Sequence, residues 1–262
     1  MKEFFENQDS RRMYMIAFGI FLLCFLIFHY SFQNGQPTCN RFIMNTYLYI
    51  ALGLSILGTV CYLFDFYKIN IGLGTSILVF ILTIVLIIYI HYVSTYKNII
   101  LNHILWLLLI VLFGLMLSPL TSSEQYKPYI FRTIQIVMLI FFFMSLIVYL
   151  FPQFFLSTYS TMMMGLFVAL LVVIVIEIIK IIYKGYTNNW EMTNVDKGIS
   201  YFVIVLFSLF VSYDTTTLKI RSKNCKESSI FLYPNYPVQS LDIILDLLNL
   251  FVRILGLQGN QS

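Results

Sequence analysis

Long apolar runs of about 20 residues alternate along this chain with short segments that contain charges, proline or glycine. Runs of that length are typical of helices that cross a bilayer, because such a helix must span the hydrocarbon core. The prolines lie outside the runs or at their edges, as expected from the helical hydrogen bond that proline removes. The pattern predicts eight spans, near residues 13–32, 43–66, 72–95, 99–120, 129–151, 155–183, 199–218 and 238–257.

Composition supports the same class. Of the 262 residues, 60% are apolar and 11% are charged, whereas a soluble domain carries about 25% charged residues. We therefore expect an all-α, multi-pass membrane protein with no room for a separate soluble domain. The net charge of +4 is spread through the loops, which fits membrane topology better than binding to nucleic acid. The first span has no cleavage pattern after it, so we interpret it as a retained anchor.

Membrane orientation stays open at this level. Most Lys and Arg residues favour a cytoplasmic N-terminus, whereas the basic segment 219–226 favours the opposite orientation. Cys39 and Cys225 follow the first and the seventh span, so they share one side of the membrane. They can form a disulfide if that side is oxidising, or remain two free thiols. Cys24 and Cys61 fall inside spans and are expected to pack there.

Carboxylates within the last two spans are the strongest functional signal. Asp214 ends the seventh span, and Asp242 and Asp246 lie in the eighth. A charged side chain at membrane depth costs about 2.5–3.5 kcal/mol on insertion scales, so such residues usually face a partner, a cavity or an ion path. Asp242 and Asp246 are one turn apart, and Asn249 and Arg253 continue the same polar stripe. We expect the last helix to be an inner helix shielded by the others, or a partial re-entrant one.

Asp214 and Asp246 lie on consecutive spans, which can pack side by side. Two adjacent carboxylates cannot both ionise cheaply, so the pair would share a proton near neutral pH and could bind Ca²⁺ transiently. The alternative is structural: Asp214 caps its helix near Lys219 and Arg221, and Asp246 pairs with Arg253 or Asn249. We favour the functional interpretation.

The other polar residues and motifs are weaker functional signals than these aspartates. Glu177 and Lys180 are spaced to form an ion pair within one helix. The sequence lacks a phosphate-binding loop, a dinucleotide fingerprint and zinc-ligand spacing, so we expect no enzyme activity. An intramembrane aspartyl protease would also use two aspartates, and Tyr213-Asp214 is similar to that class. The Gly-x-Gly-Asp motif of the second aspartate is missing at Asp246, so this alternative is remote.

Several motifs occur in the order found in a known family. The segments are Asn45-Thr-Tyr47, Phe113-Gly-Leu-Met-Leu-Ser-Pro119, Tyr213-Asp214-Thr215, Leu245-Asp246-Leu-Leu-Asn249-Leu-Phe251 and Arg253-Ile-Leu-Gly256. Together they resemble the Bax inhibitor-1 family, also called the transmembrane BAX inhibitor motif or Lifeguard family. The likeness extends over about residues 43–257, and the two C-terminal motifs are the most specific.

The resemblance implies a seven-helix core at residues 43–257, preceded by an additional helix within residues 1–42 and followed by a tail at 258–262. It also implies that Asp214 and Asp246 form a pH sensor that gates a slow Ca²⁺ leak, in a group of proteins that suppress cell death. In some members a basic residue near the second core helix partners the aspartates. Here His91 or Lys97 would have to take that role.

The resemblance also implies a permeant ion, a class of partners and a membrane location. Calcium would be the permeant ion, with no other cofactor, and the partners would be membrane lipids and proteins that regulate apoptosis. The protein would lie in the endoplasmic reticulum or Golgi membrane if eukaryotic or viral, and in the inner membrane if bacterial. The rival hypothesis is a non-conducting membrane protein that inhibits apoptosis by binding partners, with the aspartates serving only packing.

Overall fold

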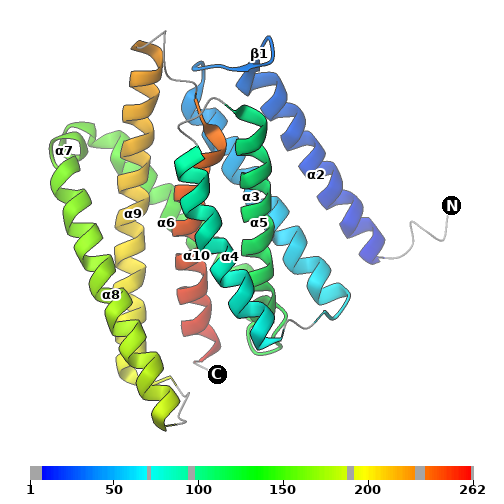
Figure 1. Ribbon diagram of the computed structural model, residues 1–262, viewed down its shortest axis with the longest axis vertical. Helices are drawn as coiled ribbons and strands as arrows, with labels where there is room; N and C mark the ends of the chain where they lie inside the picture. The colour runs from blue at the N-terminus through cyan, green and yellow to red at the C-terminus, as the bar shows by residue number, and fades with distance from the viewer. Residues whose placement is uncertain (1–7, 70–71, 94–97, 188–191, 228–233, 261–262) are drawn as a thin grey trace. The chain divides into compact units, whose positions relative to one another are not determined.

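The computed structural model describes residues 8–69, 72–93, 98–187, 192–227 and 234–260. Within these ranges the chain is helical, apart from short connections and a small hairpin of β1 (Phe32–Gln33) and β2 (Gln36–Pro37). Figure 1 shows the helices α2 (Gln8–Ser31), α3 (Phe42–Phe66), α4 (Leu73–Val93), α5 (Ile99–Thr121), α6 (Ile130–Leu150), α7 (Pro152–Ser157), α8 (Tyr159–Thr187), α9 (Asn194–Glu227) and α10 (Tyr236–Gly259).

This architecture confirms the predicted fold class. In the described ranges, seven helices are long and apolar enough to cross a membrane. The eighth, α10, carries two aspartates and an arginine, yet its apolar side is among the most buried surfaces of the chain. The expectation of an inner last helix is therefore confirmed. Hydropathy located the spans well but not all helix ends, since α9 runs from Asn194 to Glu227 rather than 199–218.

The predicted span 155–183 is in fact two helices. α7 begins at Pro152, and α8 begins at Tyr159. Proline is favoured at the first helical position because its missing N–H would be unpaired there anyway. Pro152 therefore ends α6 and starts a new short helix in a different direction.

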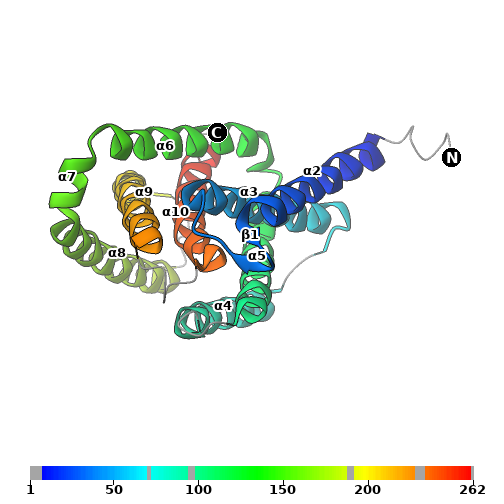
Figure 2. The ribbon, with the colours of Figure 1, turned by 90° about the horizontal axis from the view of Figure 1, so that it is seen from above.

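The chain divides into two compact units, and the first comprises Met1–Ser123 and Arg221–Ile244. In this unit α3 packs against both α2 and α5, and α4 packs against the other side of α5 (Figure 2). Gly114 allows the close approach of α3 and α5, because a Cβ there would lie 2.7 Å from the Cβ of Val60. Gly53 does the same for α10, because its Cβ would lie 2.8 Å from Ile244 Cδ1.

Buried hydrogen bonds fix the start of α10 in this unit. Trp106 Nε1 of α5 donates to Ser240 Oγ at 2.9 Å. Tyr236 is stacked beside Tyr49 of α3, with ring centroids 5.7 Å apart. Burial raises the pKa of Tyr236 to about 12, so its phenol stays protonated and donates a hydrogen bond to the Thr38 carbonyl.

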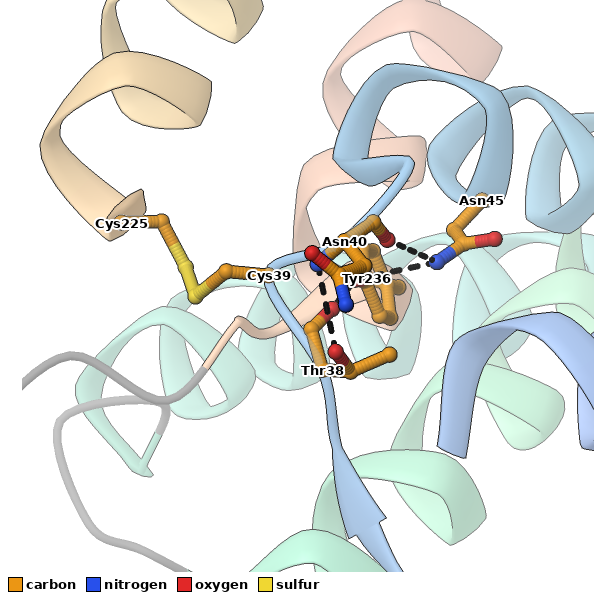
Figure 3. Close-up of a disulfide and its surroundings, with 6 residues drawn as sticks. All are labelled: Thr38, Cys39, Asn40, Asn45, Cys225 and Tyr236. Atoms are coloured by element: carbon orange, nitrogen blue, oxygen red, sulfur yellow. Dashed lines mark hydrogen bonds between the residues drawn. A yellow bond between two sulfur atoms is a disulfide. The ribbon is translucent and has the colours of Figure 1, made fainter. Parts of the chain in front are cut away.

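A disulfide joins Cys39, which follows the β-hairpin, to Cys225 in the last turns of α9 (Figure 3). The two Cα atoms are 5.8 Å apart, within the usual range for a disulfide. The sequence left this pairing open, and the structure forms it. Cys61 is buried, as expected for a packing residue, whereas Cys24 lies on the exposed side of α2.

The second unit comprises Glu124–Ile220 and Leu245–Ser262. Here α6, α7 and α8 form a bend around α9, as Figure 2 shows from above. The end of α10 is held against the start of α6, where Thr133 Oγ1 donates to Gln258 Oε1 at 2.9 Å. Gln125 Nε2 also donates to the Gly259 carbonyl at 3.0 Å. These bonds fix the position of the end of α10 along its own axis relative to the start of α6.

Candidate functional site

Asp214 lies on α9, whose sides have different neighbours. One side faces α6: Ser212 Oγ donates to the Met144 carbonyl at 3.5 Å, and the hydroxyls of Thr215 and Ser145 are 3.3 Å apart. Hydroxyls that bond across helices in this way stabilise membrane bundles modestly. The residues on either side of Asp214 in this part of α9 are therefore held by specific contacts rather than by apolar packing alone.

A second side of α9 faces α8. Tyr213 donates from its hydroxyl to the Tyr159 hydroxyl at 2.9 Å, and their rings are stacked with centroids 4.8 Å apart. The Tyr159 hydroxyl also lies 3.0 Å from Thr217 Oγ1. The rotation of α9 about its own axis is thus set by contacts on two sides.

The third side of α9 carries Asp214. Residues three and four apart share one side of a helix, so Asp214 lies in line with Phe207, Val211 and Leu218. Those three side chains are buried, with 8%, 0% and 3% exposed, and Asp214 is half-buried. Its carboxylate therefore belongs to an inward side of α9 rather than to a lipid-facing one.

Asp246 lies on α10 and is only 5% exposed. Its neighbours along the helix, Ile244, Leu247 and Leu250, are almost completely buried. Asn249, one turn later, is half-buried and donates back to the Leu245 carbonyl at 2.9 Å. The predicted polar stripe on α10 is thus present, and Asp246 is its most buried charged member.

The depths of the two aspartates can be compared through a common landmark. Ile204 of α9 and Ile254 of α10 line the same pocket of about 450 Å³, which residues of α6 also line. At a rise of about 1.5 Å per residue, Asp214 lies about 15 Å beyond Ile204, and Asp246 lies about 12 Å before Ile254. Because α9 and α10 run in opposite directions (Figure 1), both aspartates lie toward the same end and at nearly the same depth.

The structural alternative made Arg253 or Asn249 the partner of Asp246, and the ion pair shown for Arg253 is a different one. Its guanidinium instead lies 2.7 Å from Glu177 Oε1 on α8. Glu177 also forms the predicted ion pair with Lys180, at 2.6 Å. The sequence contains no signal for the longer contact, because the two residues come from helices far apart in the chain.

The ion pairs continue from Glu177 toward the start of α9. Lys180 lies 3.5 Å from Asp196, and Lys184 lies 2.8 Å from the same carboxylate. Asp196 also accepts hydrogen bonds from the backbone N–H and the hydroxyl of Thr193. This charge network ties together α8, α9 and α10 at one end of the second unit.

Asp242 belongs to the first unit and has two basic neighbours. His91 Nε2 of α4 lies 3.4 Å from one carboxylate oxygen, and Arg221 of α9 lies 3.7 Å from the other. His91 was expected as a basic partner of the Asp214–Asp246 pair; the contact shown here is with Asp242, so that role stays a prediction. Lys97, the other candidate, falls outside the described residues.

Chemically, the carboxylates of the stripe can attract a hard cation. Carboxylate oxygens are preferred Ca²⁺ ligands, and tight sites use six to eight oxygen ligands in roughly fixed positions. Among the residues that the structure describes, no group of three or more His, Cys, Asp or Glu side chains is placed to hold a metal ion.

The number and length of the apolar helices define a multi-pass integral membrane protein. The sequence profile of the family described as "Inhibitor of apoptosis-promoting Bax1" matches residues 39–262. The chain therefore belongs to the Bax inhibitor-1 family, which confirms the resemblance drawn from its motifs, and α2 precedes the matched region. No curated protein matches the chain significantly.

Proposed function

We propose that this protein is a pH-sensitive calcium leak channel, gated by the carboxylates of Asp214 and Asp246. The observation that carries the proposal is the shared depth of the two aspartates on antiparallel helices, with Asp246 buried and Asp214 on an inward side of α9. A buried carboxylate inside a membrane protein usually marks an ion or proton path.

Two basic residues of the second unit, one on α9 and one on α10, have defined contacts. Arg253 is engaged by Glu177, and Lys219 is directed to the Val148 carbonyl and the Tyr149 ring. Asp242 is the second carboxylate of α10, although His91 and Arg221 offset its charge.

The expected gating follows from proton sharing. At low pH the two carboxylates hold a proton between them and can stay close, whereas loss of that proton makes both negative and drives them apart. The separated, charged state would attract Ca²⁺ and admit it to the path. Protonation would thus shift an equilibrium between a closed and an open arrangement of α9 and α10.

Regulation of cell death would follow from such a leak, because it would change the calcium content of the compartment that the membrane encloses. Apoptosis-regulating membrane proteins and lipids would then be the partners. In a non-conducting protein, by contrast, the aspartates would only support packing, and their neutralisation would change stability without changing flux.

The test is calcium flux in proteoliposomes from about pH 6 to pH 8, the range in which a coupled carboxylate pair can titrate. Wild type is compared with Asp246→Asn, and with Asp65→Asn at the end of α3 as a matched control. The proposal expects a pH-dependent flux that Asp246→Asn alters and Asp65→Asn does not. A well-folded wild type without calcium flux would instead support the non-conducting protein.

A further inference from the structure

The Cys39–Cys225 disulfide lies at the start of the helix that carries two of the aspartates. Cys39 is preceded by Thr38, whose carbonyl accepts from Tyr236, the first residue of α10. Asn45 Nδ2 of α3 donates both to the Tyr236 hydroxyl at 3.2 Å and to the Asn40 carbonyl at 3.0 Å (Figure 3). The segment 38–40 therefore joins the disulfide directly to the beginning of α10.

The other end of the disulfide leads to the same helix. Cys225 follows Arg221 by four residues, so both lie on one side of α9, one turn apart. Arg221 reaches Asp242 of α10 at 3.7 Å. Its guanidinium is almost half exposed, so this contact holds only while the end of α9 stays in place.

The two routes meet on α10, at Tyr236 and at Asp242. We propose that the Cys39–Cys225 disulfide is a thiol-sensitive latch, and that its reduction frees the end of α9 and releases Arg221 from Asp242. The structural part of this proposal stands by itself. Its consequence for ion flux rests on the proposed function, because release of Arg221 would leave the charge of Asp242 less compensated, one helical turn before Asp246.

The chemistry is ordinary thiol–disulfide exchange with a small thiol or a dithiol protein as reductant. A reductant thiolate attacks one sulfur, a mixed disulfide forms, and the other cysteine leaves as a thiolate that takes a proton from water. A second reductant thiol then resolves the mixed disulfide, which leaves two protein thiols and one oxidised reductant. Cys39 is half-buried and Cys225 is 5% exposed, so the attack falls on Cys39.

The first experiment counts thiols and measures hydrogen exchange in the full-length protein in nanodiscs, with and without dithiothreitol. Maleimide labelling should add two reactive thiols after reduction. Backbone amides in the last turns of α9 and in residues 236–246 should then exchange at least roughly tenfold faster, because local opening becomes cheaper when a disulfide is removed. Amides of α8 should not change.

Matched variants identify the cysteines. Cys24→Ser should keep the whole response, since Cys24 is a free thiol on α2. The double variant Cys39→Ser/Cys225→Ser should exchange fast at both segments without reductant and should not respond to it. The proposal would be overturned if reduction of the disulfide left hydrogen exchange at residues 236–246 unchanged. It would also be overturned if Cys39 and Cys225 were free thiols in protein purified without reductant.

Flux measured on the same samples separates this proposal from the proposed function. Faster exchange together with a changed calcium leak supports both. Faster exchange in a protein that conducts no calcium supports the latch and contradicts the channel. If the leak depends on Asp246 but dithiothreitol changes neither the hydrogen exchange nor the calcium flux, the latch alone is contradicted.

Discussion

Arg253 of α10 lies 2.7 Å from Glu177 of α8, so an ion pair inside the bundle links two helices that are far apart in the sequence. Both side chains are largely buried, with 26% and 19% exposed. Glu177 has a second cationic partner, Lys180, whereas Arg253 has only Glu177 among the ion pairs of the described residues. The two ends of the pair should therefore differ in their tolerance of substitution.

We expect Glu177→Gln to destabilise the protein more than Arg253→Gln. Breaking a buried pair by removing one partner costs about 3–5 kcal/mol, and the partial exposure here places the cost near the lower end. After Arg253→Gln, Glu177 keeps Lys180; after Glu177→Gln, Arg253 loses its partner. Thermal unfolding in detergent measures the difference, with exposed Arg132→Gln as a control. Equal losses for the two variants would contradict this account.

Gly114 and Gly58 provide a matched pair of glycines. A Cβ on Gly114 would lie 2.7 Å from Val60 Cβ, whereas nothing lies within 4 Å of a Cβ on Gly58. Gly114→Ala should therefore lower stability by about 1–3 kcal/mol, the usual cost of overpacking. Gly58→Ala should be neutral or slightly stabilising, because alanine is the better helix former by about 1 kcal/mol. A higher melting temperature for Gly114→Ala would show that α3 and α5 are not in close contact there.

Because the phenol of Tyr236 is buried, we expect the folded protein to lose stability at alkaline pH. Burial raises the pKa of Tyr236 from 10.0 to about 12 in the folded protein. The unfolded chain therefore loses this proton first, so the contribution of Tyr236 is fully present below pH 10.0 and is lost progressively toward pH 12. The free energy of unfolding, measured with denaturant across this pH range, should fall less steeply with pH in Tyr236→Phe than in wild type. Identical pH dependence in the two proteins would count against a buried phenol.

The disulfide makes a prediction about orientation. Disulfides persist on oxidising sides of membranes, so the side that holds Cys39 and Cys225 should be lumenal or extracellular. Because α2 separates residue 39 from the N-terminus, an N-terminal tag should lie on the reducing side. This orientation also agrees with the overall Lys/Arg tally. Protease protection of a tag in sealed microsomes measures it, and a tag protected within the lumen would refute the assignment.

Hydropathy predicted the spans because each apolar run must match the bilayer, but it could not predict where a helix continues beyond its apolar run. α9 extends nine residues beyond its predicted end at residue 218, through the basic segment that contains Lys219 and Arg221. Apolar length marks the membrane part of a helix, whereas Lys and Arg are themselves good helix formers.

The candidate site was predicted only in part. The stripe of Asp242, Asp246, Asn249 and Arg253 follows from helical spacing alone. The partners of that stripe do not, because Glu177, Arg221 and His91 reach it from other helices, and one sequence contains no signal for which helices adjoin. The positions of Asp214 and Asp246 on consecutive spans suggested them as a pair, the resemblance to the family agreed, and their coupling stays a prediction.

The most direct test of that coupling is the pH profile of calcium flux for wild type, Asp214→Asn, Asp246→Asn and the double variant in proteoliposomes. If the two carboxylates share a proton, each single variant should shift or abolish the pH response, and the double variant should do little more than either one alone. Independent, additive effects of the two substitutions, or calcium flux that is indifferent to both, would contradict gating by the Asp214–Asp246 pair.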